Sequence, residues 1–421
     1  MSDAQPLPAR PDLDQYKKLA KDLQRAGTAT DADAFRHCAV RWLEALAHAR
    51  QVELTAEIRA RIEREAHRME QRWQKLLGRG RSRTRTRTAR SAPGGAPETR
   101  PIRVTDAQLF VAREHEFASW PKFAAHIAQL MRPGSPVANF EAAVDAIVAG
   151  DIAVLASLLR VHPDLVRARS TRQHRSTLLH YVSANGVEDY RQKTPPNIVE
   201  ITRLLLDAGA DVNATSDAYG GGSTTLGLAG TSVHPEQAGV QMELLELLLK
   251  RGASLEQPGY PLVKACLANG QGPAARLLAS RGAALDFEDA AGVGRLDLVK
   301  GYFDENGRLR NGATQNQLES GFLYACGYGR TEVAEFLLAK GVDPNVMNSQ
   351  GQTPLHWVAY GPHVAVAKLL LHHGADVNVK DGNGRTPLQW ALGNLSSEGT
   401  EEEARRAHEL VALLRAAGAS A

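Results

Sequence analysis

Apolar positions in the second part of the chain follow the three-and-four spacing of amphipathic helices, and they come in pairs of short stripes. One stripe covers residues 355–359, and after a turn at Gly361-Pro362 a second covers residues 364–371. This spacing predicts two short helices joined by a tight turn. A single pair of this kind cannot bury both of its stripes, so neighbouring pairs must stack.

Polar and small residues mark where each predicted helix begins and ends. Thr353 precedes the first stripe, where its hydroxyl suits a helix cap, and Pro354 suits a first turn that needs no amide donor. Gly374 follows the second stripe, where a left-handed cap favours a residue without a side chain. Residues 381–384 then predict an outward turn into the next unit.

The helix-pair pattern returns at a fixed period. Gly341 and Gly374 begin matching strings 33 residues apart, and Thr353 and Thr386 have the same separation. Such a period is typical of proteins whose units stack in a row. The predicted register has eight units, the first an opening cap: Phe140–Ser170, Thr171–Ala214, Thr215–Gln257, Pro258–Ala284, Leu285–Arg308, Leu309–Val346, Met347–Val379 and Lys380–Ala421.

The recurring Thr-Pro-Leu-His, Leu-Leu-Leu and Gly-Ala-Asp-Val-Asn strings of residues 136–421 resemble the ankyrin-repeat family. The resemblance implies an all-α fold: an ankyrin-repeat solenoid of stacked helix-turn-helix units with short β-hairpin loops, preceded by a helical N-terminal region. It also implies a non-enzymatic protein-protein interaction scaffold that binds a partner protein through its concave groove and hairpin tips.

Several units depart from the family pattern. Extra loops are expected around residues 187–196, 231–239 and 393–402, because these stretches exceed the period. The spacing between Gly282 and Ala290 is short, so the outward hairpin there is predicted to be missing. The register of the central units, residues 258–308, is left open.

The N-terminal region, residues 1–135, is predicted to be a helical leader separate from the repeats at 136–421. Residues 13–50 and 51–77 have helical patterns, and 78–101 reads as an Arg-rich flexible linker. Thr105 is expected to cap one further helix, and Ser119-Trp-Pro121 to open another. The matching stretches Leu13–Leu23 and Asp106–Lys122 are similar to a leader that precedes the repeats of many bacterial ankyrin-repeat proteins.

Charge divides the chain in the same place. Residues 1–135 hold 25 Lys and Arg against 16 Asp and Glu, a net +9, and the remaining 25 against 31 give −6. The acidic repeats would associate faster with a partner that has a basic surface. Arg outnumbers Lys 38 to 12, which is associated with a bacterial, GC-rich source. Three scattered cysteines and no run of 18 apolar residues predict a cytoplasmic protein without a disulfide framework or a transmembrane segment.

Three groups of residues could suggest chemistry, but each has a more ordinary interpretation. Thr353 and His356 could form half of a nucleophile pair, yet the family uses them to tie a helix start to a neighbouring loop. His363, His372 and His373 are read as a solvated helix end, because adjacent helical residues point about 100° apart and cannot easily share a metal. Residues 220–224 lack the lysine of a phosphate loop and are read as a hairpin tip. We therefore predict no catalytic, cofactor or metal residues.

The aromatic residues of the repeats are predicted to have two different roles, packing between repeats and contact with a partner. Trp357 and Trp390 lie one period apart, at a position that faces the neighbouring repeat in the family, so packing is favoured. Tyr328 and Tyr360 lie near the ends of first helices and are predicted to contact a partner. The full set of predicted partner-binding residues is Gln173, His174, Tyr328, Ser349, Gln350, Gln352, Tyr360, Gly382, Asn383 and Arg385.

A different function class remains open at the N-terminus. Six arginines lie between Arg79 and Arg90 with no acidic residue among them, a pattern that could bind nucleic acid or an anionic surface. In that alternative the repeats would act as a recruiting arm. The same run is also typical of a solvated tether.

Overall fold

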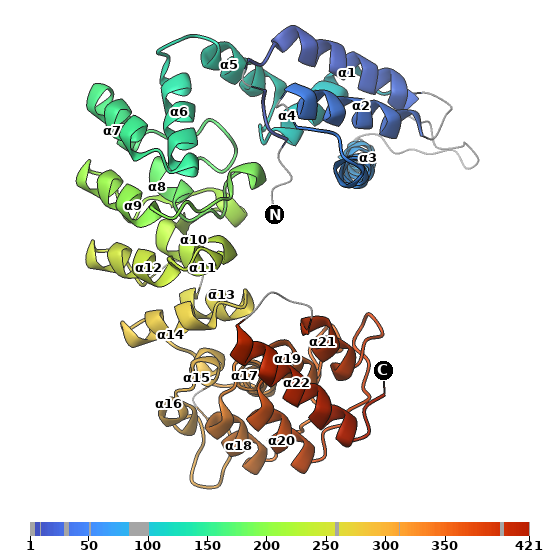
Figure 1. Cartoon of the computed structure of the whole chain (residues 1–421), viewed down its shortest axis with the longest axis vertical. Helices are drawn as coiled ribbons and strands as arrows, with labels where there is room; N and C mark the ends of the chain where they lie inside the picture. The colour runs from blue at the N-terminus through green and yellow to red at the C-terminus, as the bar shows by residue number, and fades with distance from the viewer. Residues whose placement is uncertain are drawn as a thin grey trace. The chain divides into compact units, whose positions relative to one another are not determined.

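The computed structural model describes residues 5–8, 10–28, 33–49, 52–83, 101–256, 261–310, 312–395 and 400–420. The chain divides into two compact units (Figure 1). Unit 1 holds residues 1–229 and 234–252, and unit 2 holds residues 230–233 and 253–421. The leader and the first repeats thus lie in one unit, and the predicted boundary at residue 135 stays a prediction.

Unit 1 begins with five helices around an aromatic core. They are α1 (Leu13–Thr28), α2 (Ala34–Ala49), α3 (Ala56–Arg83), α4 (Val104–Glu114) and α5 (Trp120–Leu130). Trp73 of α3 stacks on Phe35 of α2 at 5.2 Å between ring centroids, and Tyr16 of α1 meets Phe123 of α5 edge-on at 5.0 Å. Both halves of the leader therefore contribute to one core.

The leader corrects several boundaries predicted from the sequence. The helical stretch 13–50 is two helices with a break between them, and α3 continues to Arg83, into the predicted linker 78–101. Arginine and leucine are good helix formers, which explains why α3 tolerates two glycines near its end. The rest of the predicted linker, 84–100, lies outside the described residues.

Of the two helix starts predicted for the leader at Thr105 and Ser119, the first is wrong and the second is confirmed. Thr105 does not cap α4: Arg103 occupies the cap position, and its backbone N–H donates to the Asp106 carboxylate at 2.9 Å. Ser119 does precede α5, with Pro121 in the first turn, as predicted.

Three helix pairs complete unit 1. They are α6 (Pro136–Ala149) with α7 (Ile152–Val161), α8 (Leu178–Tyr181) with α9 (Ile198–Asp207), and α10 (Thr225–Gly230) with α12 (Gln241–Lys250), and α11 (Val233–Gln237) forms part of an inserted loop. The first pair begins before the predicted Phe140, because Ser135 caps α6 by accepting the N–H of Ala138 at 3.1 Å. Short 3-10 turns cover Pro163–Arg167, Asp189–Arg191 and Ala218–Gly220.

One hairpin in unit 1 forms a small sheet. Strand β1 (Thr215–Ser216) pairs antiparallel with β2 (Ser223–Thr224), so Thr215 lies opposite Thr224. Residues 220–222 lie at its tip, as predicted, but Ser223 and Thr224, which were predicted to belong to the tip, form β2. No second sheet occurs among the described residues.

Unit 2 is a stack of five helix pairs. They are α13 (Leu262–Ala268) with α14 (Gly272–Ser280), α15 (Phe287–Val293) with α16 (Leu296–Lys300), α17 (Gln315–Gly327) with α18 (Thr331–Ala339), α19 (Pro354–Tyr360) with α20 (Val364–His372), and α21 (Pro387–Asn394) with α22 (Glu401–Ala416). Successive first helices pack on one another, and so do the second helices from α16 to α22, which confirms the predicted stacking.

The shortened central unit also behaves as predicted. Residues 281–286 pass from α14 directly into α15 without a described outward strand, and Asp286 caps α15 by accepting the N–H of Asp289 at 2.8 Å. One apolar core extends from Phe287 through Phe322, Leu355 and Leu370 to Leu410. The last four pairs of unit 2, from α15 to α22, therefore share a continuous interior.

Candidate partner-binding groove

The Thr-Pro-Leu-His strings form the expected structural links. In unit 2, Nδ1 of His356 accepts the N–H of Thr353 at 3.1 Å, and its Nε2 donates to the carbonyl of Arg385 at 3.0 Å. In unit 1, His180 makes the equivalent bonds to Thr177 at 3.1 Å and Ser223 at 3.3 Å. Burial lowers the pKa of His180 to about 4, so this imidazole is neutral. Both rings tie a helix start to the next loop, as the structural interpretation predicted.

Two outward loops of unit 2, residues 348–352 and 381–385, form what we call the tip ledge. Asn348 Oδ1 accepts the N–H groups of Gln350 and Gln352 at 2.9 and 3.0 Å. Gly382 donates its N–H to the Gln350 carbonyl at 2.7 Å, which joins the two loops. The structure thus brings together five exposed residues that were predicted to bind a partner: Ser349, Gln350, Gly382, Asn383 and Arg385.

A side-chain cluster fixes the second loop of the ledge. Asp381 Oδ1 accepts the N–H groups of Asn383 and Arg385, each at 2.9 Å, and its other oxygen accepts the indole N–H of Trp390 at 3.0 Å. The Arg385 guanidinium lies over the Trp390 ring at 4.9 Å. These contacts hold the loop in one conformation before any partner arrives.

Beside the ledge lies a cavity of about 890 Å³, which we call the aromatic groove. Its walls come from the first helices α13, α17, α19 and α21 and from the start of α22. Four aromatic side chains line it, Tyr328, Trp357, Tyr360 and Trp390, together with Gln352. Tyr360 is 67% exposed. The predicted residues Tyr328, Gln352 and Tyr360 therefore share one concave surface.

Tyr328 is more constrained than a free contact residue. Its hydroxyl donates a hydrogen bond to the carbonyl of Leu267, and burial raises the pKa of this phenol well above its usual range. The ring lies against Gly272, where an added Cβ would come within 2.7 Å of it. Tyr328 thus forms the fixed wall of the groove, and Tyr360 the exposed one.

The two tryptophans pack against neighbouring repeats, as predicted. Trp357 meets Tyr324 edge-on at 5.6 Å, and Trp390 meets His356 at 5.7 Å. The indole N–H of Trp357 is buried and has no hydrogen-bond acceptor among the described residues. This donor therefore lies inside the repeat stack and is not exposed to solvent.

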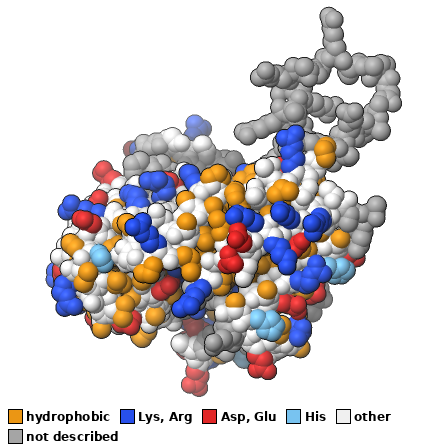
Figure 2. Space-filling view, turned by 90° about the horizontal axis from the view of Figure 1, so that it is seen from above, with side chains coloured by type: hydrophobic (Ala, Val, Ile, Leu, Met, Phe, Trp, Pro, Cys, Tyr) orange, Lys and Arg blue, Asp and Glu red, His pale blue; other side chains and the backbone are white. Residues whose placement is uncertain are grey.

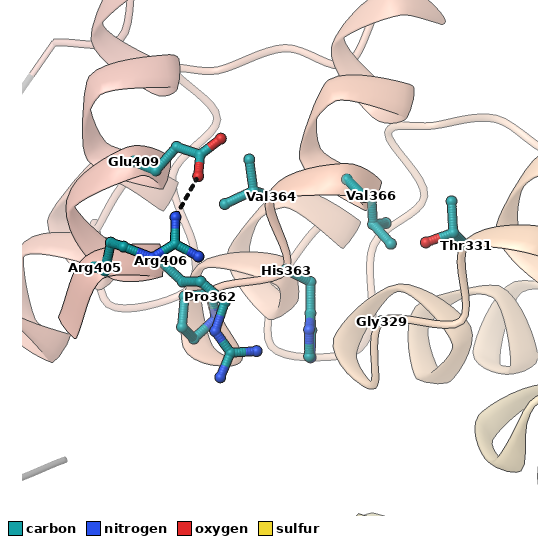
Figure 3. Close-up of a pocket in the computed structure, with 10 residues that line it drawn as sticks. Gly329, Thr331, Pro362, His363, Val364, Val366, Arg405, Arg406 and Glu409 are labelled. Carbon is teal, nitrogen blue, oxygen red and sulfur yellow. Dashed lines mark ion pairs between the residues drawn. The ribbon is translucent and has the colours of Figure 1, made fainter. Parts of the chain in front are cut away.

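His363 corrects the prediction of a solvated histidine cluster. Its Nε2 donates to the Gly327 carbonyl at 3.0 Å, and the ring fills space above Gly329 and Gly361. Burial lowers its pKa to about 4, so the ring is neutral. Figure 3 shows it at the edge of a smaller cavity of about 280 Å³, near Pro362, Arg405 and Arg406. His372 and His373 are exposed, as predicted.

In unit 1, the structure separates the two predicted contacts of the second repeat. Gln173 is exposed, but His174 is 6% exposed, with its Nδ1 accepting the N–H of Ser176 at 3.1 Å. Its Nε2 lies 3.7 Å from Glu188, in a buried ionic network. The burial of His174 argues against its predicted role as a partner contact. The alternation of polar residues did not reveal this, because the buried carboxylate comes from the inserted loop.

That ionic network anchors the inserted loop 187–196 to α6. Arg191 pairs with Glu141 at 2.7 Å and with Glu188 at 3.3 Å, and Arg172 pairs with both carboxylates. Burial favours protonation, yet the two guanidinium groups hold the pKa of Glu188 well below its usual range. The four charges balance within the interior.

Two further side chains were not predicted from the sequence to lie at a surface or in the groove: the exposed Tyr219 and the charged Arg406. Tyr219 lies at the tip of the β1–β2 hairpin, is 66% exposed and has a left-handed backbone with φ of 53°. The adjacent glycines signalled the turn but not the exposed ring. Arg406 enters the aromatic groove because α22 is long and begins beside Pro362.

Potential metal ligands are scattered in the part of the chain that the structure describes. No group of three potential metal ligands is found there, and no helix there is long and apolar enough to cross a membrane. Cys38, Cys266 and Cys326 are buried, free thiols.

The basic surface predicted for the N-terminal region consists of the arginines from Arg79 to Arg90. Side chains from Arg79 to Arg90 lie outside the described residues. Elsewhere in the leader, Arg72 is paired with Glu65 and Glu114, each at 2.7 Å. Lys and Arg side chains are spread over the face shown in Figure 2, with hydrophobic and acidic side chains between them. Binding of nucleic acid or an anionic surface stays a prediction.

Comparisons with known proteins address the repeat pattern. Residues 322–402 match the family model described as ankyrin repeats (3 copies). Among solved structures, the chain is similar to the ankyrin repeat domain of Bcl-3, described as a unique member of the IkappaB protein family. The identity is 19% over 64% of this chain and 97% of that chain, with a TM-score of 0.29. No curated protein matches the sequence.

Proposed function

Because the chain is an ankyrin-repeat protein, we propose that it is a non-enzymatic scaffold in the cytoplasm that binds a partner protein through unit 2. Repeats of this kind in general mediate protein-protein interaction. The proposed contact surface consists of the aromatic groove and the tip ledge, which lie on the same set of repeats.

The exposed ring of Tyr360 in a groove of about 890 Å³ is the observation that carries this proposal. Aromatic side chains dominate the energetics of interfaces, because they bury a large area with little loss of conformational freedom. Two further rings of the groove, Trp357 and Trp390, are held by packing before binding. A partner would therefore meet a preformed surface, which reduces the entropy cost of association.

Hydrogen bonding favours a polypeptide as the occupant. The exposed phenol of Tyr360 can donate a hydrogen bond to a backbone carbonyl, whereas the indole N–H of Trp357 is buried out of a partner's reach. The ledge adds exposed backbone and amide groups at Ser349, Gln350 and Asn383. A partner chain that crosses from the ledge into the groove can use both sets of contacts.

The proposal is tested by affinity capture from the source cell with the full chain and two matched variants. Tyr360→Ala removes the exposed ring of the groove, and Tyr219→Ala removes a ring of almost equal exposure, 66% against 67%, in unit 1. A polypeptide that wild type and Tyr219→Ala retain but Tyr360→Ala loses supports the groove. Equal retention by all three proteins, with an unchanged thermal melt, rejects it.

A further inference from the structure

The aromatic groove runs across the C-terminal ends of first helices in unit 2. Tyr328 directly follows α17, Tyr360 ends α19 and Trp390 lies in α21, and all three line the groove. Each of three successive helix pairs therefore presents a ring. Packed helices lie about 8–10 Å apart, so an occupant that follows the groove meets an aromatic surface at roughly this interval.

Backbone carbonyls at these helix ends already have donors from within the chain. The carbonyl of Leu267 accepts the hydroxyl of Tyr328, and that of Gly327 accepts the Nε2–H of His363 at 3.0 Å. The side-chain amide of Asn394 donates to the last two carbonyls of α19, each at 2.9 Å. The acceptors that a helix end normally leaves open are therefore occupied here.

Polar side chains along the groove are committed in the same way, with one exception. The indole N–H of Trp390 donates to Asp381 at 3.0 Å, and Gln352 makes two side-chain hydrogen bonds within the tip ledge, at 2.8 and 3.0 Å. The phenol of Tyr360 is exposed and has no hydrogen-bond partner among the described residues. The groove thus offers an open donor, whereas its helix-end acceptors are occupied.

The charged side chains that line the groove balance one another. Glu403 is ionised and accepts the N–H and the hydroxyl of Thr400 at 2.8 and 3.0 Å. Arg406 lines the same end and lies 3.8 Å from Glu402, and His363 is neutral. One positive and one negative group leave the described lining without net charge. Charge complementarity therefore favours an uncharged occupant.

We propose that the aromatic groove binds an uncharged, proline-rich segment of the partner in the polyproline II conformation. This inference rests on the proposed function of the groove and specifies the chemistry of its occupant. Proline has no backbone N–H, so such a segment brings few unpaired donors against the rings and the occupied carbonyls. A polyproline II helix has no internal hydrogen bonds, so one of its carbonyls can accept the phenol of Tyr360.

The period of this helix matches the spacing of the rings. A polyproline II helix has three residues per turn and rises about 3.1 Å per residue, so it repeats about every 9 Å. Helix pairs follow one another at about 8–10 Å, so prolines three residues apart can each meet a ring of the next pair. Aromatic-lined grooves are suited to such segments, whose preformed conformation lowers the entropy cost of binding.

Other conformations of the occupant use the groove less completely. An extended segment without proline brings an N–H at every residue to a surface whose helix-end carbonyls are occupied. An α-helical segment pairs its own N–H groups, but it also pairs its carbonyls, so the phenol of Tyr360 gains no backbone acceptor. These two occupants are alternative outcomes of the test.

Fluorescence anisotropy on the full chain tests the proposal with three labelled peptides. The first repeats Pro-Ser-Leu, so its prolines share one face of the polyproline II helix. The second repeats Pro-Ser-Leu-Ser with the same number of prolines, which places successive prolines on different faces. The third repeats Ala-Ser-Leu, which restores the N–H groups and permits an α-helix.

Three variants locate the binding site on the chain. Tyr360→Ala removes the exposed ring of the groove, and Tyr360→Phe removes only its hydroxyl. Tyr219→Ala is the matched control, because it removes a ring of almost equal exposure in unit 1.

We expect the Pro-Ser-Leu peptide to bind most tightly, with the other two roughly five- to tenfold weaker. Tyr360→Ala should weaken its binding roughly tenfold and Tyr360→Phe roughly two- to fivefold, whereas Tyr219→Ala should have no effect. Added salt should leave the affinity unchanged, because the segment and the groove carry no net charge.

The outcomes separate this inference from the proposed function. An Ala-Ser-Leu or Pro-Ser-Leu-Ser peptide that binds as tightly, with the same dependence on Tyr360, overturns the polyproline II occupant and leaves the groove function intact. So does the failure of all three peptides when Tyr360→Ala still loses the captured partner. Binding of the Pro-Ser-Leu peptide that Tyr360→Ala does not weaken overturns the inference, and if the captured partner is also retained, both proposals are overturned.

Discussion

The hydroxyl of Tyr328 donates a hydrogen bond to the backbone carbonyl of Leu267, which lies two helix pairs earlier in the stack. The shortened α15–α16 pair lies between them in sequence, and its Gly292 offers no Cβ in the space beside Leu267 and Tyr324. The absence of a side chain at Gly272 leaves room for the Tyr328 ring, and its absence at Gly292 lets Leu267 and Tyr324 come close. One wall of the aromatic groove is therefore fixed by the shape of the central repeats.

Removing this hydroxyl should have a modest effect on stability. Leu267 keeps a second partner, the N–H of Gly270 at 3.1 Å, so its carbonyl is not left unsatisfied. We expect Tyr328→Phe to lower the free energy of unfolding by about 1 kcal/mol in urea. Tyr360→Phe is the matched control and should have no measurable effect, because its ring is exposed. A larger loss for Tyr360→Phe would contradict the assigned environments.

The buried ionic network of unit 1 should be far more sensitive to a change in one partner. Glu188 is fully buried and faces both Arg172 and Arg191. Glu188→Gln leaves these two guanidinium groups with too little negative charge, so we expect a loss of about 3–5 kcal/mol. Asp297→Asn, which breaks an exposed pair with Arg295, should leave the melting temperature unchanged. Equal effects of the two variants would show that the network is not buried in solution.

Asp289 predicts a pH dependence of stability. Burial and the charge of Asp286 raise its pKa from 3.8 to about 7, and Lys264 acts in the opposite direction. Between about pH 4 and pH 7 the folded chain therefore binds a proton that the unfolded chain does not. The contribution of Asp289 to stability is fully present below about pH 4 and is lost as pH rises through about 7.

Replacing this carboxyl group checks the sign. Asp289→Asn should raise the free energy of unfolding by about 1 kcal/mol at a pH near 8, and by less at a pH near 5, where Asp289 already holds a proton. Urea melts at the two pH values measure the difference. A variant whose stability changes equally at both would contradict the raised pKa.

Stacking of the pairs depends on side chains such as Leu370 of α20. This side chain is fully buried in the core of unit 2. Leu370→Ala should lower the free energy of unfolding by roughly 2–5 kcal/mol, because it leaves a cavity between repeats. Lys368→Ala on the same helix removes only an exposed ion pair with Glu409, and chemical denaturation should show little change. A small effect at Leu370 would mean that neighbouring pairs do not share one core.

The repeat pattern was readable from the sequence because its signals are local. The caps at Thr353 and Thr386, the left-handed Gly374 and the apolar stripes each act within a few residues, so their spacing gives the helix pairs directly. The links from His356 to Arg385 follow from the same period. Tyr328 and Tyr360 fall in one groove because both lie at the C-terminal ends of neighbouring first helices, one position out of register with the 33-residue period.

Other features were hidden because they depend on contacts between distant segments. The burial of His174 follows from Glu188 in an inserted loop, and that of His363 follows from the carbonyl of Gly327.

Hydrogen-deuterium exchange of the full chain, with and without its captured partner, tests the binding surface most directly. We predict slower exchange on binding in residues 348–352 and 381–385 and at the C-terminal ends of α17 and α19, where Tyr328 and Tyr360 lie. The exposed second helices α18 and α20 should be unchanged away from their first turns. Protection confined to unit 1, with none in these loops, would contradict the assignment of the groove and the tip ledge.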